Sequence, residues 1–157
     1  MKTINYIIGD ATNPQTEGNK IIVHICNDIG GWGKGFVMAL SRKWPEPEQR
    51  YREWHKSQEG FELGAVQFVQ VANDLWIANL IGQHKIRKDE NGNPPIRYDA
   101  VAKGLTQVAE KAVSLNASVH MPRIGCGLAG GKWEHIEPLI MDSLIASKVG
   151  TTVYDFG

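Results

Sequence analysis

A glycine-rich segment in the second half of the chain is the strongest candidate for a binding site. It reads Met-Pro-Arg-Ile-Gly-Cys-Gly-Leu-Ala-Gly-Gly over residues 121–131, and it follows an apolar run that ends at Pro122. A strand that stops at proline and opens into glycine-rich backbone exposes main-chain N–H groups, which suit an anion, most often a phosphate. The same residues also fit a tight strand-to-helix turn in which glycine only relieves strain. This segment alone supports both interpretations equally.

A second segment has the same plan and favours the phosphate interpretation. Residues 20–27 are β-branched and nearly continuously apolar, which predicts a strand buried on both faces. Asp-Ile-Gly-Gly-Trp-Gly-Lys-Gly follows over residues 28–35, and good helix formers occupy residues 36–44. Two glycine loops at the carboxyl ends of strands in one sheet can hold the two phosphates of a diphosphate between them.

Length and composition are those of one ordinary globular domain, expected to span residues 1–157. Hydrophobic residues make up 42% and charged residues 22%, and 17 basic residues balance 17 acidic ones. The zero net charge argues against a surface that coats nucleic acid, but a small anionic ligand needs only local donors.

The N-terminal residues and the two cysteines argue against several classes of protein. The first residues contain no apolar signal core, and no run is long enough to span a bilayer, so we expect a cytoplasmic location. Cys26 and Cys126 are too few for a disulfide framework, and neither has a partner at metal-ligand spacing. The sequence therefore predicts neither a metal site nor a cofactor.

The elements that would position these loops alternate between strands and helices. Their order is strand, strand, helix, helix, hairpin, helix, strand, helix, strand, which indicates a layered α/β domain with a mixed sheet. Pro138 is expected to confine the last helix to its later residues or to kink it. The predicted strands are residues 3–8, 20–27, 65–71, 75–81, 117–121 and 151–156, and the predicted helices are residues 36–44, 45–56, 97–116 and 133–147.

The stretch from His84 to Pro95 is the least ordered by composition. Its charges favour a solvated loop. Its position after Gly-Gln-His at residues 82–84 also allows a flap beside the ligand site, and both interpretations stay open.

Taken together, these pieces resemble the macrodomain family, over essentially the whole chain and in the family's order. The matching segments are Gly-Asp-Ala-Thr at 9–12, His-Ile-Cys-Asn-Asp-Ile-Gly-Gly-Trp-Gly-Lys-Gly at 24–35, Met-Pro-Arg-Ile-Gly-Cys-Gly at 121–127 followed by Trp133, and Val-Tyr-Asp-Phe at 153–156. The resemblance is greatest to the ADP-ribose 1″-phosphate phosphatases and to the enzymes that remove terminal ADP-ribose. It implies a three-layer α/β/α fold with a central mixed sheet and an ADP-ribose site.

The resemblance implies a contact for each part of ADP-ribose. Asp10 and the N–H of Ala11 would meet adenine, Phe156 would cover its ring, and Asn27 would lie at the distal ribose. Asp10 also fits a turn or helix-cap residue, and a terminal Phe is by default core packing. The implied contacts are Asp10, Ala11, Asn27, Gly33, Lys34, Gly35, Phe36, Arg123, Ile124, Gly125, Cys126, Gly127, Leu128, Ala129 and Phe156.

The chain departs from the family where chemistry is expected. Family members that remove ADP-ribose from acidic side chains use a Lys and an Asp, and the matching residues here are Gln83 and Ala129. Lys85 lies close enough in sequence to substitute for the lysine, but nothing replaces the aspartate.

The polar residues left near the distal ribose are therefore the candidates for catalysis. His24 fits a general acid or base, although a hydrogen-bonded core histidine is the more common role for such a strand residue. Asp28 could orient a water molecule, but it also fits a solvated loop. We predict His24, Asn27 and Asp28 as catalytic, with Gln83 and His84 nearby.

Three functions follow as hypotheses. The first is hydrolysis of an ADP-ribose derivative such as ADP-ribose 1″-phosphate. The second is removal of ADP-ribose from a modified protein or nucleic acid. The third is ADP-ribose binding without turnover. In each case the expected partner is ADP-ribose or its derivative, and no membrane partner is expected.

Overall fold

A six-stranded mixed sheet forms the middle of the molecule in the computed structural model, which describes residues 3–156. The strands are β1 (Ile4–Ile8), β2 (Lys20–Asn27), β3 (Val66–Ala72), β4 (Leu75–Gln83), β5 (Ser118–Met121) and β6 (Thr151–Asp155). The helices are α1 (Phe36–Ser41), α2 (Glu46–Ser57), α3 (Tyr98–Leu115) and α4 (Trp133–Ile140), and α4 continues into the π-helical turn η1 (Met141–Ile145).

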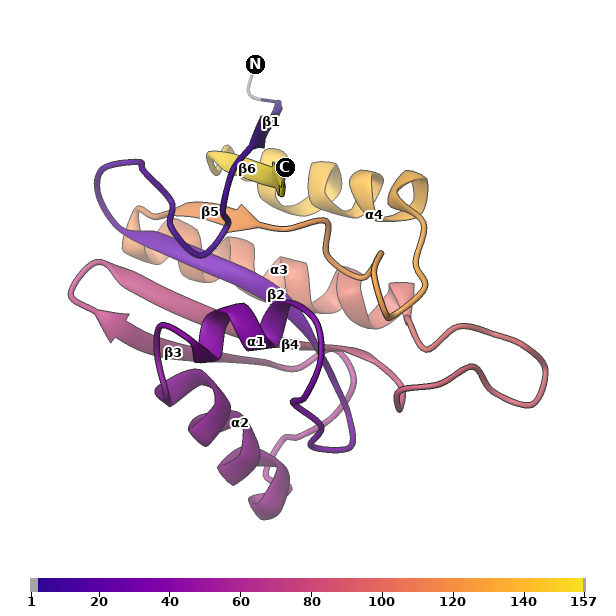
Figure 1. Cartoon of the computed structure of the whole chain (residues 1–157). Helices are drawn as coiled ribbons and strands as arrows, with labels where there is room; N and C mark the ends of the chain where they lie inside the picture. The colour runs from indigo at the N-terminus through magenta and orange to yellow at the C-terminus, as the bar shows by residue number, and fades with distance from the viewer. Residues whose placement is uncertain (1–2, 157) are drawn as a thin grey trace.

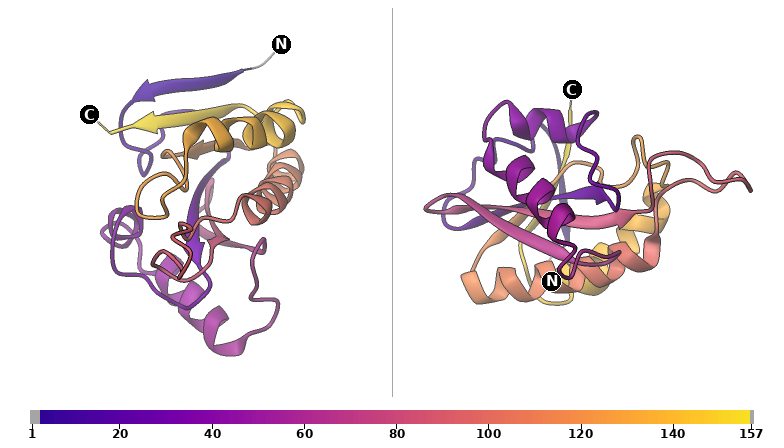
Figure 2. Two further views of the ribbon diagram at one scale, coloured as in Figure 1. Left: turned by 90° about the vertical axis from the view of Figure 1, so that its right-hand side faces the viewer. Right: turned by 90° about the horizontal axis from the view of Figure 1, so that it is seen from below.

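The strand order is β1-β6-β5-β2-β4-β3 (Figure 1). Only the β3–β4 pair is antiparallel, because a short turn joins these strands, whereas helices and longer loops connect the parallel ones. Helices α1 and α2 cover one face of the sheet, and α3 and α4 cover the other (Figures 1 and 2). The predicted three-layer α/β/α arrangement with a mixed sheet is confirmed.

Strand β2 lies at the centre and contributes to both hydrophobic cores. Its alternate residues Ile21 and Val23 pack under α3 and α4, whereas Ile22 and Cys26 pack under α1 and α2. These side chains are at most 3% exposed. Burial on both faces explains why the sequence of this strand is continuously apolar instead of alternating.

Helix α3 packs an apolar stripe against the sheet. Val101, Leu105, Val108 and Ala112 are buried. Gly104 lies between them, and a methyl group added there would lie 2.4 Å from Leu80 Cγ. A residue with no side chain is therefore needed for α3 to approach β4 this closely.

The prediction for the last helix is only partly correct. The α-helical part is the earlier one, Trp133–Ile140, with Pro138 inside it, and the later residues form the π-helical turn. Proline removes one helical N–H, so the carbonyl of Glu134 loses its usual partner. Both residues are exposed, so water can bond to that carbonyl and the helix tolerates the proline.

The segment between β4 and α3 projects from the body of the molecule (Figures 1 and 2). Its base is closed by hydrogen bonds between the N–H of His84 and the carbonyl of Pro95, at 2.8 Å, and between the N–H of Arg97 and the carbonyl of Gly82. Its tip turns around Asp89, whose carboxylate accepts the N–H groups of Asn91 and Asn93.

None of the helices in the described part of the chain has the length and apolar character that a membrane crossing requires.

Candidate functional site

The carboxyl ends of the parallel strands bring the predicted site residues to one edge of the sheet. Strands β1, β6, β5, β2 and β4 run in the same direction, so the residues that follow them emerge together. Asp10 follows β1, Asp28 follows β2, His84 follows β4, Pro122 follows β5 and Phe156 follows β6. Residues from both ends of the chain thus meet at a single edge.

Asn27 shapes the first glycine loop through its side-chain amide. Its Oδ1 accepts the N–H groups of Ile29 and Gly31, both at 3.0 Å, and its Nδ2 donates to the carbonyl of Gly31 at 3.0 Å. The hydroxyl of Tyr51 lies 2.6 Å from the Asn27 carbonyl and 2.9 Å from Oδ1. The amide is therefore largely occupied by the loop, and its contact with a distal ribose stays a prediction.

Helix α2 holds the same loop from outside. Arg52 donates from Nη1 to the carbonyl of Gly30 at 3.0 Å. Gly30 has a φ of +78°, and a methyl group there would lie 2.4 Å from Nδ1 of His55. Trp32 packs against the ring of Tyr51, with centroids 5.5 Å apart.

The second glycine loop, residues 122–131, closes on itself through main-chain bonds. The N–H of Gly131 donates to the carbonyl of Gly125 at 2.7 Å, and the N–H of Gly130 donates to the carbonyl of Gly127 at 3.1 Å. The carbonyl of Ala129 accepts the N–H of Ile96, which ties the loop to the base of the projecting segment. A methyl group on Gly131 would lie 2.4 Å from the Gly125 carbonyl oxygen, so the closure requires glycine.

Both loops present main-chain N–H groups that bond to nothing within residues 3–156. In the first loop these are the N–H groups of residues 33–36, and in the second those of Gly125 and of residues 127–129. The loops touch, because a methyl group on Gly35 would lie 3.3 Å from Cδ1 of Leu128. Free donors in two adjoining loops are the kind of arrangement that can bind a phosphate.

The remaining predicted contacts differ in their exposure, which determines whether a side chain or the main chain is available. The exposed residues are Asp10, Gly33, Lys34, Gly35, Gly127, Leu128 and Phe156, the half-buried ones are Asn27, Phe36, Arg123, Gly125 and Cys126, and the buried ones are Ala11, Ile124 and Ala129. The buried three can offer a ligand only their main chain.

Asp10 and Phe156, the predicted adenine contacts, follow the ends of two paired strands, β1 and β6. The N–H of Gly9 donates to the carbonyl of Asp155, which joins the ends of β1 and β6. Asp10 Oδ1 accepts the N–H and the hydroxyl of Thr12, at 2.8 and 2.7 Å, and the hydroxyl bond is the main cause that lowers the pKa of this carboxyl. Asp10 is thus a turn residue whose Oδ2 has no partner within residues 3–156. Phe156 is 86% exposed and does not pack in the core.

Arg123 belongs to a separate cluster beside the site. Its guanidinium forms two hydrogen bonds with the Asp155 carboxylate, at 2.6 and 3.0 Å. It also lies over the rings of Tyr6 and Trp133, at 5.2 and 5.0 Å from their centroids. The side chain is therefore already paired, and its contact with ADP-ribose stays a prediction.

His24 is buried beneath the first loop. It is 1% exposed, and its Nε2 lies 2.5 Å from Oδ1 of Asn79. Nδ2 of Asn79 donates to the carbonyl of Pro47 and to Gln67, so Oδ1 is the acceptor and Nε2 of His24 carries the proton. Trp32 and Phe36 cover the ring. Burial lowers the pKa of His24 to about 4, which keeps the ring neutral.

Asp28 joins the first loop to the projecting segment. Its Oδ2 lies 2.7 Å from Nδ1 of His84, and its Oδ1 accepts the N–H of Lys85 at 2.8 Å. Sequence reasoning named both Asp28 and His84 but did not pair them. The sequence carries no signal for this pairing, because it depends on the parallel register of β2 and β4, in which Asn27 pairs with Gln83.

Gln83 and Ala129, which stand at the positions of the family's Lys and Asp, make only local contacts. Gln83 donates from Nε2 to the carbonyl of Lys85 at 2.9 Å. Lys85 is exposed and has a left-handed backbone, with φ of +59°. Ala129 is buried.

Cys126 in the second loop has a pKa raised mainly by burial, which disfavours the reactive thiolate.

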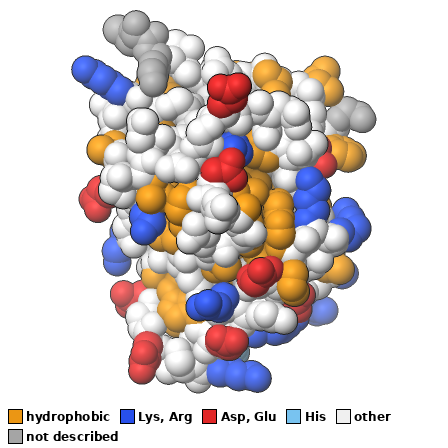
Figure 3. All heavy atoms as spheres, turned by 90° about the vertical axis from the view of Figure 1, so that its left-hand side faces the viewer, with side chains coloured by type: hydrophobic (Ala, Val, Ile, Leu, Met, Phe, Trp, Pro, Cys, Tyr) orange, Lys and Arg blue, Asp and Glu red, His pale blue; other side chains and the backbone are white. Residues whose placement is uncertain are grey.

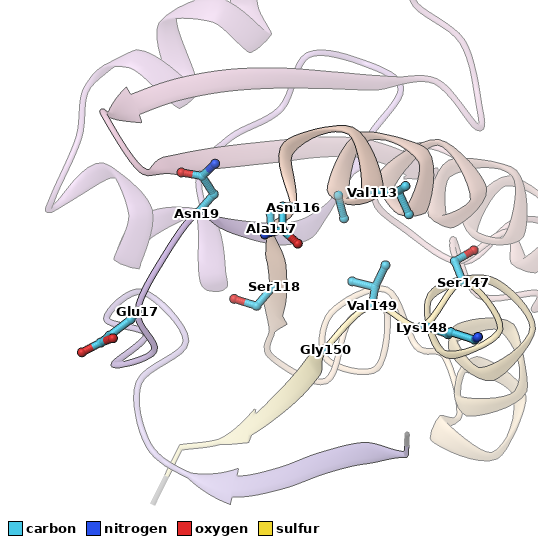
Figure 4. A pocket seen from close by; sticks show the side chains of 11 residues that line it. Glu17, Asn19, Val113, Asn116, Ala117, Ser118, Ser147, Lys148, Val149 and Gly150 are labelled. Atoms are coloured by element: carbon cyan, nitrogen blue, oxygen red, sulfur yellow. The ribbon is translucent and has the colours of Figure 1, made fainter. Parts of the chain in front are cut away.

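A hollow lies at the opposite edge of the sheet, where β2 and β5 begin (Figure 4). It measures about 390 Å³, with Asn19 and Glu17 on one side and Ser147 and Lys148 on the other (Figure 4). Figure 3 shows the face on this side, with hydrophobic side chains near its centre. None of the predicted site residues lines this hollow.

Across residues 3–156, no group of three or more His, Cys, Asp or Glu side chains is arranged to hold a metal ion.

Known structures resemble this chain over nearly its whole length. A macrodomain protein from Streptomyces coelicolor is 53% identical with a TM-score of 0.88, and the match covers 99% of this chain and 100% of that one. A protein of unknown function from Bacteroides thetaiotaomicron is 63% identical with a TM-score of 0.96, and the match covers 98% of each chain. Thermosipho africanus DarTG in complex with ADP-ribose is 18% identical with a TM-score of 0.68, over 85% of this chain and 37% of that one, and shares the fold alone.

Curated proteins are related at lower identity. The chromodomain-helicase-DNA-binding protein 1-like of Danio rerio is 33% identical over 96% of this chain, but this chain spans only 15% of that protein's length. The ADP-ribose 1″-phosphate phosphatase of Lodderomyces elongisporus is 29% identical over 90% of this chain and 94% of its own length. A comparison with models of known protein families gave no match.

The fold, the two glycine loops and these relatives together define the class. The chain belongs to the macrodomain family.

Proposed function

We propose that this macrodomain binds ADP-ribose across its two glycine loops and hydrolyses an ADP-ribose derivative, ADP-ribose 1″-phosphate being the first candidate. The observation that carries the proposal is the set of free main-chain N–H groups in two loops that touch at Gly35 and Leu128. Such donors match the oxygens of a diphosphate, and they need no positive net charge on the protein.

The ends of the site suit the two ends of the ligand. The free Oδ2 of Asp10 can accept the adenine amino group, and the exposed ring of Phe156 can cover the base. The distal ribose would then lie toward Asp28 and His84, the polar pair that follows β2 and β4.

Two relatives support this assignment. The Lodderomyces elongisporus protein is a phosphatase of ADP-ribose 1″-phosphate and matches this chain nearly end to end. The Thermosipho africanus complex holds ADP-ribose in a protein of the same fold. Gln83 and Ala129 stand where family members that remove ADP-ribose from acidic side chains have a Lys and an Asp. This replacement also favours phosphate removal over that reaction. Phosphate removal requires charge stabilisation and a positioned water molecule, not a protein nucleophile.

Calorimetry with ADP-ribose tests the binding step. We expect one site per chain, competition by ADP-ribose 1″-phosphate, and weaker binding in Asp10→Ala, with GDP-ribose as a control that lacks the adenine amino group. Equal affinity for ADP-ribose and GDP-ribose would contradict the adenine assignment. The absence of any binding would overturn the whole proposal.

Phosphate release from ADP-ribose 1″-phosphate tests the reaction. We expect turnover by the wild-type protein that is inhibited by ADP-ribose. Tight ADP-ribose binding without turnover of any derivative would identify the protein as a reader.

A second candidate function is removal of ADP-ribose from a modified protein or nucleic acid. The observation that favours it is the projecting segment beside the proposed distal-ribose end, which carries the exposed side chains of Lys85, Arg87 and Lys88. A macromolecule attached to the distal ribose would meet this segment. Release of free ADP-ribose from a modified peptide or oligonucleotide tests this function, and unchanged release by Lys85→Ala would exclude a lysine mechanism.

The cytoplasmic location expected from the sequence is part of the same proposal. Cys26 and Cys126 are both free thiols, as is usual in a reducing compartment.

A further inference from the structure

We propose that His84 is the residue that transfers protons at the distal-ribose end of the site, and that Asp28 positions its ring. This inference rests on the proposed hydrolase function and names the group that would carry it out. Its basis is the contact of 2.7 Å between Nδ1 of His84 and Oδ2 of Asp28, at the carboxyl ends of β2 and β4. The His84 side chain is 42% exposed, whereas the Asp28 side chain is 17% exposed.

The contact determines which ring nitrogen is available. A carboxylate accepts hydrogen bonds and cannot donate them, so Nδ1 of His84 carries the proton in this pair. In the neutral ring the lone pair is then on Nε2, and no hydrogen bond to Nε2 occurs within residues 3–156. A histidine held by a carboxylate on one nitrogen and free on the other is the arrangement of a general base.

The surrounding bonds hold the pair in place. The second oxygen of Asp28 accepts the N–H of Lys85, and the N–H of His84 donates to the carbonyl of Pro95. Ile86, next along the segment, lies against the first loop, because a methyl group on Gly31 would be 3.3 Å from Cδ1 of Ile86. The base of the projecting segment is therefore docked on the glycine loop, and Asp28 is the point of attachment.

His24 is the competing candidate, and its surroundings argue against it. Its ring is 1% exposed, covered by Trp32, and its one proton is donated to Asn79. A proton could not reach a substrate from this position without opening the core. The catalytic role that the sequence suggests for His24 thus fits His84 better.

The proposed step balances as follows for ADP-ribose 1″-phosphate. The oxygen of a water molecule forms a bond to phosphorus while Nε2 of His84 accepts a proton from that water. The bond between phosphorus and the 1″ oxygen breaks, and the 1″ oxygen takes the proton from the imidazolium. The products are ADP-ribose and phosphate, and the neutral ring is restored.

The pH dependence of this step depends on the charged groups around the ring. Asp28 contacts it directly, and the others belong to the same segment, to helix α2 and to the start of α3. The groups on these elements are Lys85, next to His84 in the chain, Arg52 and His55, which lie against Gly30 of the first loop, and Arg97, whose N–H closes the base of the segment.

The test compares His84→Gln and Asp28→Asn with His135→Gln, a control at an exposed histidine on α4. ADP-ribose affinity, kcat and the pH profile of phosphate release are measured for each. We expect His84→Gln to lower kcat about 100-fold or more and to abolish the fall in activity on the acid side, while ADP-ribose affinity changes less than about threefold. Asp28→Asn should lower kcat about 10-fold or more, and His135→Gln should match the wild type.

A second variant separates proton transfer from folding. In His84→Ala, added imidazole should restore part of kcat, and the same imidazole should have no effect on Asp28→Asn. If the wild type turns over and His84→Gln keeps its kcat and pH profile, the assignment of His84 is overturned while the proposed function stands. If the wild type binds ADP-ribose but turns over no derivative, hydrolysis itself is overturned, and the role of His84 with it.

Discussion

The two glycine loops present the same kind of donor but are built in different ways. The first loop, residues 28–35, is held from outside by side chains, namely the amide of Asn27, the hydroxyl of Tyr51 and the guanidinium of Arg52. The second loop is held by its own main chain, through the bond from Gly131 to Gly125 and the bond from Gly130 to Gly127.

The difference determines which substitutions each loop tolerates. A loop held by side chains fails when a polar group is removed, because buried partners are then left unpaired. A loop held by its own backbone fails when a side chain is added, because there is no space for it and the main-chain bonds break. The proposed anion site should therefore be sensitive to deletion on one side and to insertion on the other.

Gly131→Ala should cause the largest loss. The added methyl group would lie 2.4 Å from the Gly125 carbonyl oxygen, a main-chain atom that cannot move without opening the loop. We expect the free energy of unfolding to fall by about 3 kcal/mol and ADP-ribose binding to be lost. Urea denaturation and calorimetry measure the two effects. Wild-type stability in this variant would show that the second loop is not closed by the Gly131–Gly125 bond.

Lowering the pH should weaken the strands that carry both loops. His24 precedes the first loop and His120 precedes the second, and burial lowers the pKa of each to about 4. A histidine in the unfolded chain titrates near 6.5, so below that pH the unfolded state binds more protons than the folded one. Stability is therefore complete above pH 6.5 and is lost as the pH falls toward 4.

The expected loss is about 2 kcal/mol between pH 6.5 and pH 5.5, about half from each histidine. Denaturation curves measured over this range give the slope. His24→Gln and His120→Gln should each remove about half of it, whatever their effect on stability at neutral pH. A slope that is unchanged in both variants would contradict burial of the neutral rings.

Much of the architecture could be predicted because its causes are local. The continuous apolar run of β2 reflects burial on both faces, and the apolar stripe of α3 reflects packing on one side. The glycine loops were predictable too, since proline and glycine mark the ends of strands in the sequence itself. The predicted hairpin of residues 65–71 and 75–81 is likewise confirmed.

The functional details depend on contacts between distant segments and could not be predicted in the same way. Nothing near Asp28 in sequence indicates that it meets His84, and nothing near Arg123 indicates that Asp155 and two aromatic rings engage its guanidinium. The Asn27 amide bonds to Ile29 and Gly31 because the backbone of the following loop turns back toward it, and this turn is apparent only in the structure. The effect of Pro138 on the last helix was predicted wrongly, because its exposure to solvent, which lets the helix tolerate a proline, is a property of the tertiary structure.

Tyr51→Phe should have a moderate effect on the first loop. The hydroxyl of Tyr51 is buried and bonds at 2.6 Å to the carbonyl of Asn27, which lies at the start of the loop. Its removal should cost about 1 to 1.5 kcal/mol of stability, because the carbonyl then lacks its buried donor. We expect a weaker affinity for ADP-ribose as well, measured by calorimetry. Phe61→Leu, which alters the packing on the same ring but no hydrogen bond, is the matched control for the affinity.

Gly33→Ala and Gly127→Ala should barely change stability, and they test directly whether the loops share one ligand. A methyl group at either position would contact nothing within 4 Å, and neither glycine has a positive φ. The free energy of unfolding should therefore change by less than about 0.5 kcal/mol in each variant. The methyl group would, however, occupy open space in a loop that carries free N–H groups, where the diphosphate is proposed to lie. We expect each variant to weaken ADP-ribose binding about 10-fold.

The Gly33→Ala, Gly127→Ala double variant should lose less affinity than the product of the two single effects, since residues that contact one ligand are coupled. A loss confined to one loop would mean that the anion is bound by that loop alone.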